Sequence, residues 1–148
     1  MTPAAKISIE LLTRAAHALE PILDRMVFIG GATTGLFITD PAISDIRPTN
    51  DVDAIVEVLS KMEYRQLENQ LQKLGFRHPV ADKNAPICRW VKTSLTVDIM
   101  PVDASILGFS NRWYKEAAEN AVVTQLGKNF SIRHVTAVYF LATKLEAF

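Results

Sequence analysis

Apolar residues recur along the chain with two different periods, one typical of helices and one typical of strands. Apolar positions three or four residues apart predict helices over residues 7–23, 32–38 and 111–121, and from about Thr136 onward. A further helix is expected to open at a capping box over residues 60–63 and to end at Gly75. These segments form the helical part of the predicted fold.

Short runs rich in apolar and β-branched residues predict strands over residues 26–29, 51–58, 87–91, 95–100, 122–126 and 130–135. Turn-forming residues join the third run to the fourth and the fifth to the sixth, so each of these pairs is expected to form a hairpin. Residues 39–50 hold two prolines and several polar turn formers, which predicts a loop. The mixture of helices and strands indicates the α+β class.

Length and composition indicate one globular domain. A chain of 148 residues can bury a full core, and a hydrophobic content of 49% favours packing over disorder. The 16 basic and 16 acidic residues balance, so the molecule as a whole has no field to attract nucleic acid. Any contact with nucleic acid therefore needs a local basic patch.

The cysteine and histidine content bears on the compartment. A single cysteine, Cys88, excludes an internal disulfide and fits a reducing compartment. The histidines His17, His78 and His134 are far apart, and no Cys/His pair has the spacing of zinc ligands. The N-terminal segment lacks a signal-peptide core, and no apolar run approaches the roughly 18 residues of a membrane span. We therefore expect a cytoplasmic protein without membrane contact.

The last predicted helix stops in mid-pattern at the aromatic residue Phe148, without a glycine or a polar tail. A free C-terminus normally frays into solvent. We therefore expect either that the sequence is a fragment of a longer chain or that its last helix packs against a partner, including a second copy of the chain.

Two glycines, Gly30 and Gly31, follow the apolar run 26–29. Glycine at a strand-to-helix turn lets backbone N–H groups approach an anion, and the start of the following helix adds the positive end of a dipole. Such a turn suits the phosphates of a nucleoside triphosphate, whereas a tight turn without a ligand is the alternative interpretation. The spacing matches neither a dinucleotide-binding turn nor a P-loop.

Two carboxylates, Asp51 and Asp53, stand two residues apart at the start of the predicted strand 51–58. Side chains alternate along a strand, so both point to the same face. Like charges held this close repel each other unless they are neutralised, and a divalent metal ion is the usual remedy. A solvated pair of acids at the mouth of a strand is the alternative.

A third carboxylate, Asp98, interrupts the β-branched run 95–100, where core residues are expected. Burying an unpartnered carboxylate is costly, so Asp98 either binds a metal or pairs with a cation. Arg89 on the neighbouring hairpin strand is the candidate cation, and the residues alone leave both interpretations open. Asp103 follows Pro101 outside the strand and ranks below Asp98 as the third acid.

The combination of an apolar residue and Gly-Gly, an Asp-x-Asp among apolar residues, and a later acid on a strand resembles the signature of the DNA polymerase β-like nucleotidyltransferase superfamily. The resemblance covers most of the chain from Val27 onward. Within the superfamily the chain is most similar to the AbiEii/AbiGii-type toxin nucleotidyltransferases and their uncharacterised bacterial relatives. The closer likeness lies in RPTNDVD (47–53), APICRW (85–90), VDIMP (97–101), LGFSNRWY (107–114) and YFLATKLEAF (139–148).

This resemblance implies a single catalytic domain over residues 1–148 with an α+β nucleotidyltransferase fold, a mixed sheet of about five strands flanked by helices. It implies two Mg²⁺ ions, which Mn²⁺ can replace, held by Asp51, Asp53 and Asp98. Asp98 would bind the catalytic ion and help to deprotonate the acceptor. In-line attack of a hydroxyl acceptor on the α-phosphate of an NTP donor would then release pyrophosphate.

The resemblance also implies the nucleotide contacts. Gly30 and Gly31 would hold the triphosphate, and Lys144 matches the helix lysine that contacts it in toxin-like members; a solvated helix cation is the alternative for Lys144. Thr49 belongs with the nucleotide-binding residues and can orient the acids by a hydrogen bond.

Arg112 and the aromatic residues Trp113 and Tyr114 form a separate cluster that can stack on a base. A packed helix start is the alternative interpretation of this cluster. Arg112 is included with the expected nucleotide-binding residues.

Two departures from the family pattern affect the functional prediction. Residues 32–50 make an unusually long connection between the glycines and the first acids, so residues 40–48 are expected to form an inserted loop near the nucleotide. Family members also continue past the final helix, so this chain is expected to lack their C-terminal helical segment. The acceptor can be RNA, such as a tRNA end, a protein hydroxyl or a small molecule, and toxin-like relatives imply an antitoxin. A non-catalytic module that binds a nucleotide or a partner is the alternative function.

Overall fold

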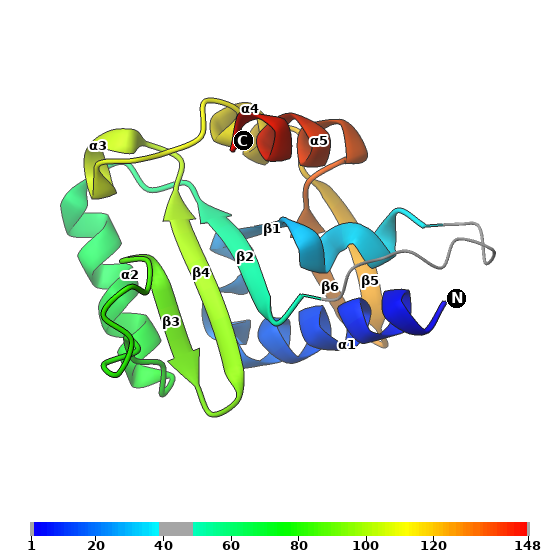
Figure 1. The fold of residues 1–148 in the computed structure, drawn as a ribbon, viewed down its shortest axis with the longest axis horizontal. Coiled ribbons are helices and arrows are strands. Elements are labelled where there is room, and N and C mark those ends of the chain that lie inside the picture. Colours follow the sequence, from blue (N-terminus) through cyan, green and yellow to red (C-terminus); the bar gives the residue numbers. More distant parts are fainter. Residues whose placement is uncertain (1, 39–48, 148) are drawn as a thin grey trace.

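The computed structural model describes residues 2–38 and 49–147, and its centre is a six-stranded mixed β-sheet with helices on both faces (Figure 1). The strands are β1 (Met26–Ile29), β2 (Asp51–Val56), β3 (Arg89–Lys92), β4 (Leu95–Pro101), β5 (Val122–Gly127) and β6 (Phe130–His134). The α-helices are α1 (Pro3–Ala18), α2 (Lys61–Lys73), α3 (Ala104–Leu107), α4 (Tyr114–Glu119) and α5 (Ala137–Glu146). Two 3₁₀ helices, η1 (Glu20–Arg25) and η2 (Gly31–Leu36), flank β1.

The strands lie in the order β3-β4-β2-β1-β6-β5. β2 is parallel to β4 and antiparallel to β1, and β1 is parallel to β6. The two predicted hairpins, β3–β4 and β5–β6, are both confirmed. The sheet therefore has six strands rather than the expected five or so, because the pairing of Phe28 with His134 joins the second hairpin to the same sheet.

One face of the sheet, here called the helix-covered face, carries the main core against α1 and α2. Alternate strand residues such as Phe28, Val52 and Val97 point to this face and are fully buried. They meet Leu12 of α1 and Leu67 of α2, which are equally buried. This continuous apolar layer fixes the register of the strands that carry the site, because a shift by one residue would turn the apolar side chains away from the helices.

The opposite face, here called the site face, carries a smaller apolar cluster. Val27, Ile29 and Ile55 pack there beneath Ala117 of α4 and Phe140 of α5. In Figure 1, α4 and α5 lie beyond the end of the sheet toward which β2 and β4 point, and Asp51 and Asp53, nearer the start of β2, are only partly buried. Polar side chains can therefore reach solvent in that part of the site face.

Several helix boundaries differ from the prediction for local reasons. The helix predicted over 7–23 begins earlier, where the Thr2 hydroxyl accepts a hydrogen bond from the Ala5 N–H, and α1 ends at Ala18. Beyond it the chain continues as η1, since Pro21 cannot donate the bond that would extend an α-helix. The helix predicted over 111–121 shortens to α4, because the Asn111 side chain accepts from the Trp113 N–H and holds a turn there.

Other predictions of local structure are confirmed or extended. The Ser60 hydroxyl accepts from the Glu63 N–H at 3.1 Å, which confirms the N-cap of α2, and the Glu63 carboxylate accepts from the Leu59 N–H. The helix predicted over 32–38 is the 3₁₀ helix η2, and α3 was not predicted. Most of the predicted loop 39–50, including the expected insertion at 40–48, lies outside the described residues.

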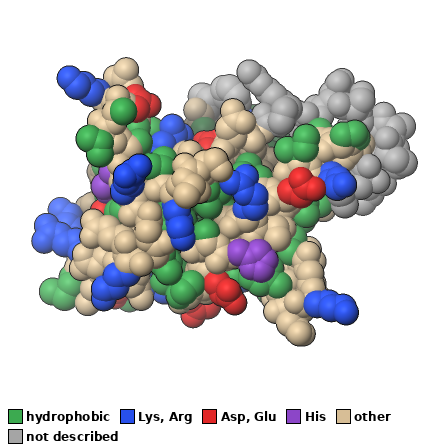
Figure 2. All heavy atoms as spheres, turned by 90° about the horizontal axis from the view of Figure 1, so that it is seen from below, with side chains coloured by type: hydrophobic (Ala, Val, Ile, Leu, Met, Phe, Trp, Pro, Cys, Tyr) green, Lys and Arg blue, Asp and Glu red, His purple; other side chains and the backbone are tan. Residues whose placement is uncertain are grey.

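Surface properties agree with the balanced composition. Figure 2 shows a face on which basic, acidic and apolar side chains are interspersed rather than gathered by type. α5 exposes the apolar side chains of Val138, Leu141 and Leu145, so packing of the last helix against a partner stays a prediction. No helix in the described ranges is long and apolar enough to cross a membrane.

Candidate active site

Three carboxylates converge on the site face. The parallel register of β2 and β4 sets Asp53 beside Asp98, and Asp51 stands two residues before Asp53 on the same side of β2. One oxygen from each of the three side chains lies within 4.8 Å of the others. The predicted convergence of Asp51, Asp53 and Asp98 is therefore present, and this cluster could bind a metal ion.

Arg89 on β3 holds two of these acids. The antiparallel register places Arg89 opposite Asp98, and its Nε and one terminal nitrogen donate to the two oxygens of Asp98, each at 2.9 Å. The same terminal nitrogen donates to Asp51 at 3.3 Å. The proposed pairing of Asp98 with Arg89 is thus confirmed, and it coexists with the carboxylate cluster instead of replacing it.

Thr49 orients the first acid. Its hydroxyl donates to the Oδ1 atom of Asp51 at 2.7 Å, while the other oxygen of Asp51 faces Arg89. The hydrogen bond predicted between Thr49 and the acids is confirmed. Asp51 is consequently fixed at both oxygens before any ligand is bound.

Asp53 differs from its two neighbours. Within the described part of the chain, the donors at the cluster reach Asp51 and Asp98, and none reaches Asp53. Burial and, to a lesser extent, the charges of Asp51 and Asp98 together raise the pKa of Asp53 to about 7, whereas Arg89 partly offsets them. Without a cation the site therefore holds Asp53 near the midpoint of its titration at neutral pH.

The glycine turn lies directly against this carboxylate. Gly30 has φ +74°, a conformation that L side chains rarely adopt. A Cβ at Gly30 would collide with the Oδ2 atom of Asp53 and lie 3.2 Å from its Cγ atom. A Cβ at Gly31 would meet Thr49 at an ordinary 3.5 Å. The close approach of backbone to carboxylate therefore depends on Gly30, and the fit at Gly31 is less restrictive.

The helix after this turn differs from the expectation. It is the six-residue 3₁₀ helix η2, in which the Thr33 and Thr34 hydroxyls donate to the carbonyls of Gly30 and Gly31. Because a macrodipole sums over aligned peptide units, such a short helix supplies little of the predicted positive field. Any anion at this turn depends on close backbone approach and on side-chain cations.

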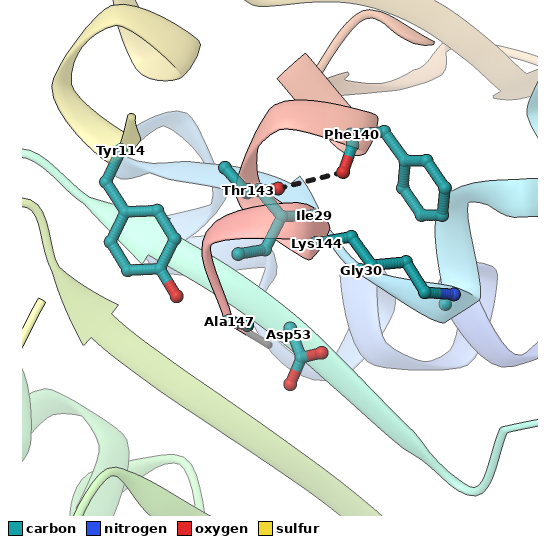
Figure 3. A pocket seen from close by; sticks show the side chains of 9 residues that line it. Ile29, Gly30, Asp53, Tyr114, Phe140, Thr143, Lys144 and Ala147 are labelled. Atoms are coloured by element: carbon teal, nitrogen blue, oxygen red, sulfur yellow. Dashed lines mark hydrogen bonds between the residues drawn. The ribbon is translucent and has the colours of Figure 1, made fainter. Parts of the chain in front are cut away.

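An open pocket of about 240 Å³ lies between the turn, Asp53 and α5. Its wall includes Gly30, Gly31, Asp53, Tyr114, Lys144 and the C-terminal part of α5. Figure 3 shows Asp53 below the last turn of α5, with Tyr114 and Lys144 on either side of it. The volume lies below the range of roughly 300–1,000 Å³ of drug-sized ligand sites, so it suits a phosphate group better than a whole nucleotide.

Lys144 brings a positive charge to this pocket. Its ammonium group lies 5.5 Å from the centre of the Phe140 ring, which is one turn earlier on α5. Lys144 therefore shares a pocket with Gly30, Gly31 and Asp53. From the sequence, Lys144 and the two glycines are expected to contact the triphosphate, and Asp53 to bind the metal beside it. Phe140, Thr143 and Ala147 also line the pocket; their successive spacing of three and four residues, which places them on one side of a helix, is the signal that identifies them.

Arg112 is not brought to the pocket. Its guanidinium group is exposed, pairs with Glu146 at 3.2 Å and stacks over Trp113 at 5.0 Å. Tyr114, from the same cluster, does line the pocket, and burial followed by the charge of Asp53 raises its pKa to about 12. Of this cluster, Tyr114 and not Arg112 is therefore the residue placed to meet a ligand.

The chemistry of the donor set can be compared with the metal that the sequence implies. Mg²⁺ and Mn²⁺ prefer oxygen ligands, and all three candidate ligands are carboxylates. Besides burial, the charges of Asp51 and Asp98 raise the pKa of Asp53, and a divalent cation would relieve this repulsion. Among the described residues, these three acids are the one group of metal-ligating side chains this close together. The residues therefore fit a divalent ion of this kind.

Comparison with protein-family models and with curated proteins identifies no relative of this chain. No protein-family model matches the chain. No curated protein matches its sequence either. The functional argument accordingly rests on the geometry of the carboxylate cluster and its pocket.

Proposed function

We propose that this chain is a Mg²⁺-dependent nucleotidyltransferase, which moves a nucleoside monophosphate from an NTP to a hydroxyl acceptor and releases pyrophosphate. The observation that carries the proposal is the approach of three carboxylate oxygens to within 4.8 Å of one another, with Asp53 in the wall of a pocket shared with Gly30 and Lys144. The resemblance to the DNA polymerase β-like superfamily, and within it to AbiEii/AbiGii-type enzymes, supports the same assignment.

Each residue has a separate task in this proposal. Asp51, Asp53 and Asp98 would hold Mg²⁺, which when bound neutralises phosphate charge and lowers the pKa of an attacking hydroxyl. The absence of a side chain at Gly30 lets the Asp53 carboxylate lie against the turn whose backbone would hold the triphosphate. Lys144, which lines the same pocket, offers its ammonium group to the triphosphate.

The site geometry constrains the chemical identity of the acceptor less than that of the NTP donor. Tyr114 borders the pocket next to Asp53 and is placed to contact the acceptor or the sugar of the donor. An RNA acceptor such as a tRNA end, a protein hydroxyl and a small molecule all share the same phosphoryl chemistry. An antitoxin is the expected partner if the acceptor is RNA, as in the toxin-like enzymes.

The test is thermal unfolding with each NTP in turn, with and without Mg²⁺. A ligand at 100 times its Kd adds about 2.7 kcal/mol to the free energy of unfolding, which corresponds to a Tm increase of roughly 5–11 °C for this size. We expect a Mg²⁺-dependent increase for the wild type that disappears in Asp51→Asn/Asp53→Asn. Asp103→Asn, a fully exposed acid outside the cluster, is the matched control and should keep the increase.

Transfer is then measured directly with the NTP that gives the largest increase, labelled at the α-phosphate. Loss of label transfer in Asp51→Asn, with an unchanged unfolding profile in the absence of ligand, supports the assignment. Equal label transfer by Asp51→Asn and the wild type would contradict the assignment as a nucleotidyltransferase.

A second candidate function is a non-catalytic nucleotide-binding or partner-binding module with the same fold. The observation that favours it is the bidentate contact of Arg89 with Asp98, which already supplies the acids with a cation. Nucleotide binding that needs no Mg²⁺ and leads to no transfer would select this alternative.

A further inference from the structure

Arg89 occupies a position between two of the candidate metal ligands. Its guanidinium group donates to both oxygens of Asp98 at 2.9 Å, and one terminal nitrogen also reaches Asp51 at 3.3 Å. The contacts are well shielded on the side of Asp98, whose side chain is only 9% exposed. Bidentate arginine–carboxylate pairs of this kind are among the stronger charged contacts in proteins.

As a consequence, the three acids are not equally free to bind a cation. Both oxygens of Asp98 accept from Arg89, and those of Asp51 accept from Thr49 and Arg89. Of the three, Asp53 alone meets no donor from the described residues. A cation that needs oxygens from all three acids must therefore compete with the guanidinium group for its ligands.

We propose that Arg89 is an internal cation that competes with the divalent ion for Asp98 and Asp51, and that it thereby sets the metal affinity of the site. This inference rests on the proposed function, because it concerns the same carboxylates. It adds a residue that the motif Gly-Gly, Asp-x-Asp and Asp does not include. Metal binding is then an exchange, in which Arg89 gives up at least one of its contacts with Asp98.

The positive charge of Arg89 determines whether removing this residue strengthens or weakens metal binding. Arg89 supplies one positive charge in direct contact with two of the three acids, and a divalent ion at those acids would be repelled by it. Removing that charge leaves the acids to repel one another, which the metal then relieves. An arginine that only positioned the acids would have the opposite effect, since its removal would weaken metal binding.

The experiment measures Mn²⁺ binding, by calorimetric titration and by the paramagnetic relaxation of water protons, without nucleotide. The variants are Arg89→Gln, which removes the charge, and Arg89→Lys, which keeps it but loses the planar fork. Arg133→Gln is the matched control, because Arg133 pairs with Glu57 at 3.6 Å just beyond the far end of β2 from Asp51.

We expect the Kd for Mn²⁺ to fall about tenfold in Arg89→Gln, and to fall less in Arg89→Lys, relative to the wild type. The Kd in Arg133→Gln should stay within about twofold of the wild type. We also expect the Tm in EDTA to fall in Arg89→Gln and the increase on adding Mn²⁺ to exceed that of the wild type. If Arg89→Gln does not fold, tighter binding in Arg89→Lys than in the wild type carries the same conclusion.

The outcomes separate this inference from the proposed function. Mn²⁺ binding by the wild type, with equal or weaker binding by both Arg89 variants, would overturn the competition and leave the metal site in place. Binding by Arg89→Gln but not by the wild type would support the competition and count against a Mg²⁺-dependent enzyme. Absence of binding in every variant would overturn both.

Discussion

The two faces of the sheet use the same strands for different purposes. On the helix-covered face, alternate residues of β1, β2 and β4 are apolar and buried against α1 and α2. On the site face, the alternate residues of β2 and β4 include Asp51, Asp53 and Asp98, and those nearer α4 and α5, such as Ile55 and Met100, are apolar. One face thus holds the strands in register, and the other uses that register to bring carboxylates together.

The difference shows where stability and chemistry separate in this molecule. Burial and then the repulsion by Asp51 and Asp98 raise the pKa of Asp53 to about 7, so the fold tolerates the cost of a buried, crowded carboxylate there. The larger apolar cluster on the helix-covered face has to supply the compensating stability. If this division is correct, substitutions on the two faces should respond to different solution conditions.

The largest expected effect is on the helix-covered face. Leu67→Ala on α2 removes a fully buried side chain and leaves a cavity, so it should lower the free energy of unfolding by about 2–5 kcal/mol at any pH. Urea denaturation measures this change. Leu59→Ala, at a position 87% exposed, is the control and should change stability by less than about 0.5 kcal/mol. Similar losses in the two variants would contradict the assigned core.

The next effect belongs to the site face and depends on pH. Because the pKa of Asp53 is raised to about 7 in the folded state, its contribution to stability is full below pH ~4 and declines as the pH rises. The loss is complete above about pH 7. The pKa shift corresponds to a loss of at most about 4 kcal/mol in the free energy of unfolding, and partial solvent exposure reduces this loss to about 2–3 kcal/mol. Asp53→Asn should therefore be more stable than the wild type at pH 8 in EDTA, and the gain should shrink toward pH 5.

The control for this pH dependence is Asp103→Asn. The Ser105 N–H donates to Asp103 and lowers the pKa of that exposed carboxylate, which is the opposite direction. Asp103→Asn should therefore give no gain at pH 8. Denaturation profiles of Asp53→Asn and the wild type that stay parallel from pH 5 to pH 8 would show that the pKa of Asp53 is not raised in the folded state.

Gly30→Ala tests the contact between the turn and the acids. The added methyl group requires a strained φ and collides with Asp53, so we expect a loss of about 2 kcal/mol in the free energy of unfolding. Gly108→Ala has a similar φ of +84° but no atom within 4 Å, and should lose only about 1 kcal/mol. Equal losses would mean that the close approach at Gly30 is not needed.

The smallest expected effect is at Thr49. Thr49→Val removes the hydroxyl that donates to Asp51, which should lower stability by about 1 kcal/mol and weaken Mn²⁺ binding through a less ordered ligand. Thr49→Ser keeps the hydroxyl and should restore both quantities. A Mn²⁺ affinity that is unchanged in Thr49→Val would show that the ordering of Asp51 does not matter for the metal.

Much of the local structure could be read from the residues themselves. β1 has the predicted bounds because an apolar run ends at a glycine, and α2 begins where its capping box begins. α1 and α4 differ from their predictions because side-chain caps at Thr2 and Asn111, and the proline at position 21, act within single turns. Apolar periodicity alone does not include such local bonds.

The site shows the same division between local and distant information. The sequence shows that Asp51 and Asp53 share a face of one strand. It does not decide whether Asp98 binds a metal or pairs with an arginine. Arg112 was grouped with the nucleotide contacts, yet its partner is Glu146, 34 positions further along the chain. No local pattern predicts which of several exposed carboxylates an arginine will meet.

The sequence by itself determined which segments form strands, to within about two residues at each end, where the backbone must be glycine, and that two acids share one face of β2. Those properties depend on φ, ψ preferences and on side-chain alternation within a few residues. Only the tertiary structure decided that β4 lies beside β2, that Arg89 bridges Asp51 and Asp98, and that α5 places Lys144 in the same pocket as Gly30. These relations follow from strand pairing and helix docking over long sequence separations, where the burial of the whole apolar surface, rather than any local preference, selects the arrangement.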